Sequence, residues 1–325
     1  MMRAVVVDRW MDPSELTVRE APEPVLTPRG VLIEVRAAGC NFFDTLIVQG
    51  RYQVKPALPF TPGAELAGVV RAVGDQVTTV RVGDRVLASG NTGGFAERAL
   101  AHESTCHVLP DSMSFDEGAA LPVIYPTSYA GLVWRGDLRA GETLLVHAAA
   151  GGVGLAAVQI GRALGARVIA TAGGREKCEI ALREGAEHAI DYRAEDFVAR
   201  VSELTDGRGA DVIYDSVGGD ITDKSLKCIA WNGRLVIIGF AGGEIPEIKA
   251  NRILLKNIAV TGLHWGAHAE KDPERIRDCF RALFRLHARG QIAPVIYRRY
   301  QLDELPKALA ALANRETYGK VIVEP

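Results

Sequence analysis

Two hydrophobic patterns follow one another along the chain. Up to about residue 121, short apolar stretches alternate with Gly, Pro and Asp, which predicts a small β-rich domain containing one short helix at 41–49. Beyond Tyr125, unbroken apolar runs alternate with helical segments, a pattern typical of parallel strands that are covered on both faces. The expected strands lie at 4–7, 31–37, 66–73, 85–88, 95–100 and 106–109, and then at 143–147, 166–171, 188–190, 211–214, 234–238 and 258–262.

The second pattern predicts an α/β fold with a doubly wound parallel sheet of six strands. The final segment continues neither pattern cleanly. It is expected to form helices at 274–289 and 303–313 and strands at 295–298 and 320–323.

The most informative stretch runs from Leu144 to Gln159: an apolar strand, a turn of small residues and a helix without charges. Ala149, Gly151 and Gly154 have the spacing of the dinucleotide fingerprint G-x-G-x-x-G, with Ala in place of the first Gly. Bare backbone there lets a pyrophosphate approach the positive end of the helix. The alternative is a close helix–strand contact without a ligand, but the flanking strand and helix favour a dinucleotide.

The end of the next strand carries Gly173 and Gly174 instead of the Asp or Glu that binds the adenosine ribose in NAD-dependent proteins. No carboxylate would repel a 2′-phosphate, and Arg175 and Lys177 can supply positive charge. The sequence therefore predicts NADPH as the cofactor. The alternative reading of Arg175 and Lys177 is a solvated first helical turn.

The charge balance and the cysteines limit the binding partners and the compartment that the sequence allows. With 38 basic and 40 acidic side chains the net charge is −2, so no overall field would hold the chain on nucleic acid or on a membrane. The five cysteines are scattered and form neither a disulfide framework nor a metal clip. The N-terminal apolar stretch is too short for a signal peptide. These features predict a cytoplasmic protein that binds neither nucleic acid nor a membrane.

Three motifs together carry a family resemblance: the segment 82–86 (VGDRV), the glycine turn 148–154 (AAAGGVG) and the segment 215–218 (DSVG). With them the chain resembles the quinone oxidoreductase (ζ-crystallin-like) branch of the zinc-free medium-chain dehydrogenases/reductases, over essentially its whole length. The resemblance implies a GroES-like catalytic domain, expected at 1–123 and 268–325, and a Rossmann domain that binds NADPH, expected at 124–267.

The resemblance also implies that no metal is bound. Zinc-dependent relatives carry a catalytic Cys where this chain has Asn41 and a His where it has Ala64, and neither residue can replace those ligands. Cys40 lies beside the first position, and His264 and His268 are spaced i,i+4, but Trp265 and Gly266 between the histidines argue against a helical clip. We expect no metal site.

The family's site residues can be carried over to matching positions. Gly173, Lys177 and Tyr192 correspond to the 2′-phosphate site, and Thr127 to a residue near the nicotinamide amide. Asn41 and Tyr52 fall where the family lines its substrate pocket, whereas a further family tyrosine is replaced by Leu46. The full set of expected cofactor-binding residues is Asn41, Thr127, Ala150, Gly151, Gly152, Val153, Gly173, Lys177, Tyr192, Val217, Gly239, Phe240, Ala241, Leu263, His264, Trp265 and Lys320.

These residues predict hydride transfer from NADPH to a quinone or related conjugated carbonyl, with Asn41 or Tyr52 bonding the oxygen that gains charge. Two plainer roles stay open: Asn41 as the N-cap of the short helix, and Tyr52 as an aromatic packed at a rim. Proton delivery from Tyr52 or from water is left open.

Two other functions also remain open at this point. One is reduction of a 2-enoyl thioester or alkenal, for which a row of arginines on one helix would meet an anionic tail unless it is simply a solvated face. The other is a non-catalytic NADPH-binding protein, crystallin-like or RNA-associated. The row comprises Arg277, Arg281, Arg285 and Arg289.

The segment 257–264 resembles the last Rossmann strand, by which relatives pair edge to edge. An apolar edge strand needs such protection. We expect a homodimer.

Overall fold

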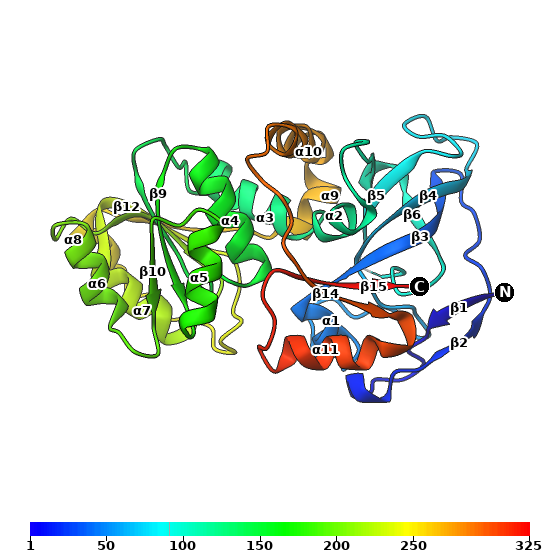
Figure 1. Ribbon diagram of the computed structural model, residues 1–325, viewed down its shortest axis with the longest axis horizontal. Coiled ribbons are helices and arrows are strands. Elements are labelled where there is room, and N and C mark those ends of the chain that lie inside the picture. Colours follow the sequence, from blue (N-terminus) through cyan, green and yellow to red (C-terminus); the bar gives the residue numbers. More distant parts are fainter. Residues whose placement is uncertain (91) are drawn as a thin grey trace. The chain divides into compact units, whose positions relative to one another are not determined.

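The computed structural model describes residues 1–90 and 92–325 (Figure 1). It contains two compact units, Met1–Val123 with Pro294–Pro325, and Ile124–Ala293. The first change of unit lies where the hydrophobic pattern changes. The second lies later than the predicted position at 267/268, because helix α10 (Pro273–Ala288) packs against α3 (Ile124–Tyr129) of the second unit.

The first unit is built on a mostly antiparallel sheet with the order β14-β15-β3-β4-β5-β7, and β6 pairs with β3. The hairpin of β1 and β2 stands apart. The strands are β1 (Met2–Val5), β2 (Val18–Ala21), β3 (Gly30–Cys40), β4 (Glu65–Val73), β5 (Arg85–Ser89), β6 (Arg98–His102), β7 (Cys106–Val108), β14 (Ile296–Gln301) and β15 (Lys320–Glu324).

The helices of the first unit are α1 (Phe42–Ile47), α2 (Phe115–Ala120) and α11 (Leu305–Ala313). Helix α2 was not among the predicted elements. Ser114 and Glu117 begin it with a capping box, in which the Ser114 hydroxyl accepts from the Glu117 N–H at 3.2 Å. Strand β2 was not predicted either, because its residues are mostly polar or exposed and so carry no apolar alternation.

The second unit contains six parallel strands in the order β10-β9-β8-β11-β12-β13. This is the order of a dinucleotide-binding Rossmann sheet, so the predicted fold class is confirmed. The order reverses between β8 and β11. The strands are β8 (Thr143–Val146), β9 (Arg167–Ala172), β10 (His188–Asp191), β11 (Ala210–Asp215), β12 (Ile229–Ile237) and β13 (Ala259–Gly262).

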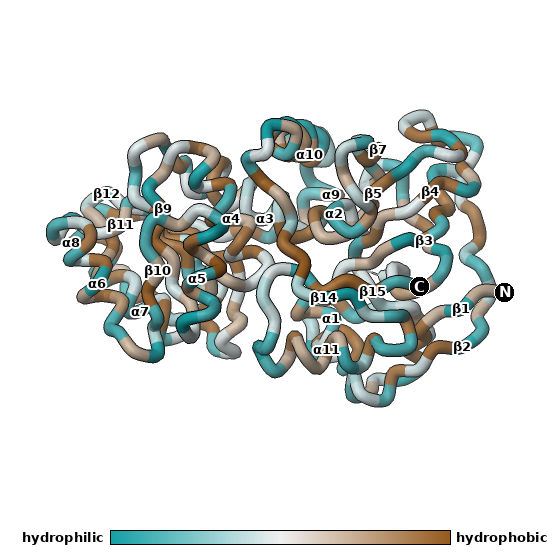
Figure 2. Tube along the Cα trace, viewed as in Figure 1, coloured by the Kyte–Doolittle hydropathy of each residue, from teal (hydrophilic) through white to brown (hydrophobic). Residues whose placement is uncertain are grey.

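Helices connect these strands, and their apolar faces close the core of the unit. Figure 2 shows apolar stretches along strands of both units and polar stretches at many of the turns. Within the described ranges, no helix is both long and apolar enough to span a membrane. Besides α3 and α10, the helices are α4 (Gly152–Ala163), α5 (Arg175–Arg183), α6 (Phe197–Leu204), α7 (Gly219–Cys228), α8 (Ala250–Lys256) and α9 (His268–Lys271).

Candidate active site

The carboxyl edge of the parallel sheet gathers most of the residues that the sequence predicts to bind a cofactor. Ligands of open α/β sheets bind at this edge, beside the point where the strand order reverses. Each of the six strands is followed closely by at least one such residue: Ala150 and Gly151 after β8, Gly173 after β9, Tyr192 after β10, Val217 after β11, Gly239 to Ala241 after β12, and Leu263 after β13.

The glycine turn after β8 has the backbone that a phosphate needs. A Cβ at Gly154 would lie 2.3 Å from the carbonyl oxygen of Ala148, so this position requires glycine. At Gly151 the nearest atom to an added Cβ is 3.3 Å away. Gly151 precedes α4 without a side-chain cap, so the first N–H groups of the helix remain available to an anion. Ala148 holds the left-handed conformation of the turn, with φ of 49°.

Helix α3 is fastened to this turn by a side chain that sequence reasoning overlooked. The hydroxyl oxygen of Ser128 lies 2.8 Å from the carbonyl oxygen of Val153 and 3.0 Å from the hydroxyl oxygen of Tyr214. Ser128 and Tyr214 are both buried. The half-buried Thr127 precedes Ser128 on α3 and therefore lies near the start of α4.

The ends of β9 and β10 meet around Gly173. A Cβ on Gly173 would lie 2.6 Å from the Tyr192 hydroxyl oxygen and 3.0 Å from Nε of Arg193. Asp191 joins the two loops, because its Oδ1 accepts from the N–H of Gly174 at 2.9 Å and from the N–H of Arg193 at 3.0 Å. These bonds, with the nearby Arg193 charge, lower the pKa of the Asp191 carboxyl. The Asp191 carboxylate is thus hydrogen-bonded to the backbone of both loops.

The positive charge at this place differs in part from the sequence prediction. Arg175 pairs with Glu179 one turn further along α5, at 2.8 Å, and projects into solvent. Arg193, which sequence reasoning missed, is exposed and forms no ion pair among the described residues. Its guanidinium stands over Gly173 because β10 is the sheet neighbour of β9, a relation that residue spacing alone does not reveal.

The loops after β11, β12 and β13 are tied to one another. The buried Asp215 accepts from the N–H groups of Val217 and Gly218 and from the hydroxyl of Thr222. The N–H of Ala241 donates to the Ser216 carbonyl at 3.0 Å. The predicted residues Val217 and Ala241 are therefore held on adjoining loops.

Trp265 and His264 lie in the segment after β13. The Trp265 ring is 6.1 Å from the ring of Trp134 and 5.7 Å from that of His268, and Arg275 lies 4.4 Å above Trp134. His268 thus belongs to an aromatic cluster, while His264 is exposed. The two histidines do not form a metal clip.

A buried histidine lies directly after β8. Its Nε2 is 2.8 Å from the Ser225 hydroxyl oxygen and its Nδ1 is 2.9 Å from that of Thr171. Ser225 donates its only hydroxyl proton to the Ile221 carbonyl at 2.6 Å, so His147 must carry its proton on Nε2 and accept at Nδ1. Burial lowers the pKa of His147 to about 4, which keeps the ring neutral.

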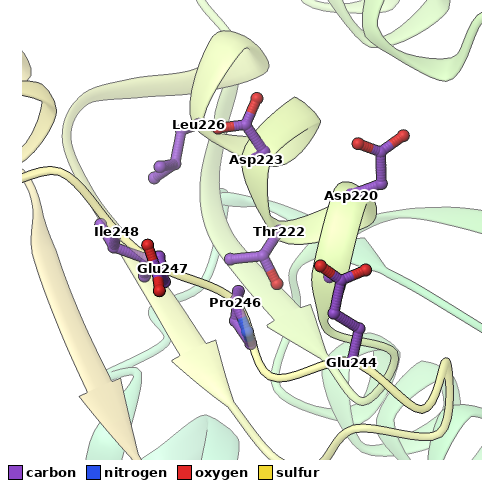
Figure 3. Close-up of a pocket in the computed structure, with 9 residues that line it drawn as sticks. Asp220, Thr222, Asp223, Leu226, Glu244, Pro246, Glu247 and Ile248 are labelled. Carbon is purple, nitrogen blue, oxygen red and sulfur yellow. The ribbon is translucent and has the colours of Figure 1, made fainter.

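A cavity of about 160 Å³ lies beside Gly219 at the start of α7 (Figure 3). Four carboxylates surround it, from Asp220, Asp223, Glu244 and Glu247. Asp220 pairs with Lys224 and Asp223 with Arg252. An acidic lining repels phosphates, so this cavity does not suit a dinucleotide.

The first unit contains a buried polar cluster where three neighbouring strands meet. The antiparallel registers place Val321 of β15 opposite Cys40 of β3, and Ala38 of β3 opposite Leu66 of β4. Lys320, Asn41 and Glu65 therefore come together from distant parts of the chain. Their exposed fractions are 2%, 7% and 0%.

The contacts of this cluster account for every proton of the ammonium group. Nζ of Lys320 donates to the Cys40 carbonyl at 2.8 Å, to Oδ1 of Asn41 at 2.9 Å and to Oε1 of Glu65. Nδ2 of Asn41 donates to Oε1 of Glu65 at 2.7 Å, and Oε2 of Glu65 accepts from the Val123 N–H at 2.8 Å. Asn41 is also the N-cap residue of α1, because its backbone N–H donates to Oδ2 of Asp44 in a capping box while its side-chain amide contacts Lys320 and Glu65.

Lys320 therefore has a different setting from the one expected of a cofactor ligand. Its side chain is enclosed within the first unit, and each of its three N–H groups already has an acceptor. A direct bond to a dinucleotide would require it to give up one of them.

Asp44 and Tyr52 lie close to this cluster. Asp44 is fully buried; its Oδ2 accepts from the Asn41 N–H at 2.7 Å, and its Oδ1 has no hydrogen-bond partner among the described residues. Burial raises the pKa of Asp44 to about 7. The half-buried Tyr52 stacks on Phe43, with ring centroids 5.2 Å apart. Burial and the Asp44 charge raise the pKa of Tyr52, so its hydroxyl stays protonated.

The residues at the positions of the zinc ligands do not fit a zinc ion. Ala64 has no ligating atom, and the Asn41 amide is occupied by Glu65 and Lys320. Burial raises the pKa of the neighbouring Cys40 thiol, which disfavours the thiolate that a metal needs. In the described part of the chain, no group of three or more His, Cys, Asp and Glu residues could hold a metal ion.

Each of the two units contains a segment that matches a known protein family. Residues 27–111 match the family model "Alcohol dehydrogenase GroES-like domain", and residues 152–284 match "Zinc-binding dehydrogenase". The chain is 43% identical to the quinone oxidoreductase-like protein 2 homolog of Nematostella vectensis, over 90% of this chain and 81% of that protein. It is 40% identical to the quinone oxidoreductase of Pseudomonas aeruginosa over the full length of both.

Solved structures agree. The Escherichia coli quinone oxidoreductase complexed with NADPH matches with a TM-score of 0.92 and 32% identity, over 99% of this chain and all of that one. The CurK enoyl reductase matches with a TM-score of 0.89 and 28% identity, over 99% of each chain. The chain is therefore an oxidoreductase with a nicotinamide cofactor and belongs to the quinone oxidoreductase branch of the medium-chain dehydrogenases/reductases.

Proposed function

We propose that the protein is an NADPH-dependent reductase of quinones or related conjugated carbonyls that works without a metal. The observation that carries this proposal is the buried cluster around Asn41. The Asn41 amide has one N–H left to donate to an oxygen that gains charge, and the residues of the cluster do not fit the zinc ion with which alcohol dehydrogenases stabilise an alkoxide. A conjugated acceptor needs only a hydride and a proton.

The preference for NADPH is supported by the surroundings of Gly173. A 2′-phosphate there would meet the Tyr192 hydroxyl, the unpaired guanidinium of Arg193, and Lys177 in the first turn of α5. The carboxylate of Asp191 is bound to the backbone N–H groups of Gly174 and Arg193. The Arg193 guanidinium and the Tyr192 hydroxyl favour the phosphate through charge-assisted hydrogen bonds, whereas NADH has no phosphate for them to contact.

When bound, the cofactor supplies a hydride, that is, two electrons and one proton. This chain's residues then act on the oxygen at which the electron pair arrives. Asn41 has a second Nδ2–H, beyond the one bonded to Glu65, that can donate to this oxygen. Tyr52 keeps its hydroxyl proton and offers a second donor. One further proton, from Tyr52 or from water, completes the quinol or enol.

An acceptor panel tests the reaction. Purified protein at fixed NADPH is given simple quinones, alkenals, enoyl thioesters and saturated aldehydes, and specificity constants are compared. We expect turnover with conjugated acceptors and none with saturated aldehydes. Turnover of saturated aldehydes or alcohols alone, or no NADPH oxidation with any acceptor, would contradict the proposal.

Binding measurements test the cofactor preference separately. We expect Arg193→Gln to weaken NADPH binding about tenfold, or ~1.4 kcal/mol, through loss of a charge-assisted contact to the phosphate, and to leave NADH binding unchanged. Arg175→Gln is the matched control because Arg175 is engaged with Glu179. Tighter binding of NADH than of NADPH by the wild-type protein would exclude this preference.

The second candidate function is reduction of a 2-enoyl thioester or alkenal, which the similarity to the CurK enoyl reductase favours. The arginine row on α10 gives it little support, because Arg277 pairs with Glu274 and Arg281 with Asp278 on the same helix. Turnover of a crotonyl thioester above that of quinones would favour this candidate.

We also propose a homodimer formed along β13. This strand ends the order of the sheet and, among the described strands, pairs with β12 alone, so its other edge needs protection. The nearby helix α8 exposes Leu254 and Leu255, at 76% and 68%. Sedimentation should give roughly twice the 35.0 kDa of one chain; a mass near 35.0 kDa would exclude the dimer.

A further inference from the structure

The buried pair of Lys320 and Glu65 has no part in the reaction proposed above. Two charges removed from water stabilise a protein little, because the cost of desolvation cancels much of their attraction. In some proteins such a pair instead fixes one arrangement among several. The group that both charges touch is the side-chain amide of Asn41.

The chemistry of the two partners dictates the orientation of that amide. An ammonium group can only donate, so the Asn41 atom 2.9 Å from Nζ of Lys320 must be the oxygen Oδ1. An ionised carboxylate can only accept, so the atom 2.7 Å from Oε1 of Glu65 must be Nδ2. Turning the amide by half a rotation would place N–H against ammonium and oxygen against carboxylate, with both contacts repulsive.

We propose that Lys320 and Glu65 are positioning residues that lock the Asn41 amide with Nδ2–H toward the substrate oxygen. This inference rests on the proposed function in one respect, namely that Asn41 donates to substrate. An isolated asparagine would present oxygen or nitrogen, and only the nitrogen can stabilise the charge that develops on a reduced carbonyl. The pair thus selects the productive orientation before substrate binds.

This role differs from that of a cofactor ligand, which the family resemblance suggests for Lys320. A ligand would need a free N–H group and exposure, and Lys320 has neither. The two roles therefore predict opposite kinetic changes. Loss of a positioning pair lowers turnover of the acceptor, whereas loss of a cofactor ligand weakens NADPH binding.

The test uses the double variant Lys320→Met with Glu65→Gln, which removes both charges and leaves no unpaired buried ion. The control is Lys307→Met with Glu304→Gln, an exposed pair of the same unit joined at 3.0 Å. With a quinone as acceptor, we expect kcat of the first double variant to fall by about a hundredfold or more while its Kd for NADPH stays within about twofold, as for loss of one oriented donor. The control should change neither.

A spectroscopic measurement without cofactor or substrate gives a second readout. In protein labelled with ¹⁵N-asparagine, the Asn41 side-chain amide, assigned by its loss in Asn41→Asp, should have one proton shifted downfield by the Glu65 carboxylate. That shift should vanish in Lys320→Met with Glu65→Gln and persist in the control. If the double variant fails to fold, Glu65→Gln alone is measured in the same two ways.

The outcomes separate the inference from the proposed function. An unchanged amide signal with unchanged kcat, or a tenfold rise in the Kd for NADPH with unchanged kcat, would overturn the positioning role. If none of the conjugated acceptors supports NADPH oxidation by the wild-type protein, the proposed function fails. The amide signal then still decides whether the pair orients Asn41.

Discussion

Asp44 offers a direct test of how burial governs this cluster. Its carboxyl is completely buried, one oxygen has no hydrogen-bond partner in the part of the chain that the structure describes, and the pKa is raised from 3.8 to about 7, with burial as the main cause. In Asp44→Asn the side chain keeps its shape and its acceptor for the Asn41 N–H, but it no longer titrates. The variant should therefore change how stability depends on pH.

The sign and size follow from linkage. The folded protein holds the Asp44 proton up to about pH 7, whereas the unfolded chain releases it near pH 3.8. Stability from this group is complete below the unfolded pKa and is lost as pH rises through the folded pKa. At 1.36 kcal/mol per pKa unit, about 2–3 kcal/mol is lost between pH 5 and pH 8. Asp44→Asn should thus gain about that much relative to wild type over this range.

Hydrogen exchange followed by mass spectrometry measures this change in stability within the first unit, because peptides from β3 and β4 report the opening of the sheet that borders Asp44. The exposed Asp75→Asn is the control and should leave the pH dependence within about 0.5 kcal/mol. If the difference between Asp44→Asn and wild type were the same at pH 5 and pH 8, the carboxyl would not hold its proton in the fold, and the reasoning would be refuted.

Two further predictions concern the second unit. His147, whose pKa is lowered to about 4, stays neutral in the fold while the unfolded chain takes up a proton below about pH 6.5, so the free energy of unfolding should fall by about 3 kcal/mol between pH 6.5 and 4. Urea unfolding of His147→Gln should lack that decline; an equal decline would assign it to other groups. In thermal melts, Gly154→Ala, whose Cβ would lie 2.3 Å from the Ala148 oxygen, should lose about 1–3 kcal/mol of stability, and the variant should also lose NADPH binding. Gly151→Ala, at 3.3 Å, should keep its fold in the same thermal melts, and equal losses would contradict the packing argument.

The fold of the second unit could be predicted closely because its strands are buried on both faces. Runs such as 144–146 and 235–237 leave no other reading, and the structure has strands at both places. The strand β12 begins earlier than expected, at Ile229, because Asn232 adopts a left-handed conformation with φ of 61° and Gly233 follows it. A local break of this kind interrupts the apolar pattern, so the pattern does not predict the first part of the strand.

The site was predictable only where it depends on local backbone. The spacing of its glycines identifies the glycine turn in the sequence. The structure shows why Gly154 is needed, because a Cβ there would collide with the carbonyl oxygen of Ala148. Arg193 and Glu65 carry no such signal. A charged residue in isolation indicates a solvated surface, and the burial of Glu65 depends on a lysine that reaches it only through the pairing of β15 with β3. Such partners follow from topology, which short sequence windows do not contain.

The distance along the chain between these two charges has a consequence for biosynthesis. Lys320 is made 255 residues after Glu65, and all of the second unit lies between them. On the ribosome the second unit can therefore fold first, whereas the carboxylate of Glu65 has no counter-ion until Lys320 and its strand β15 have been synthesised. The part of the protein that is made first is then the part that is finished last.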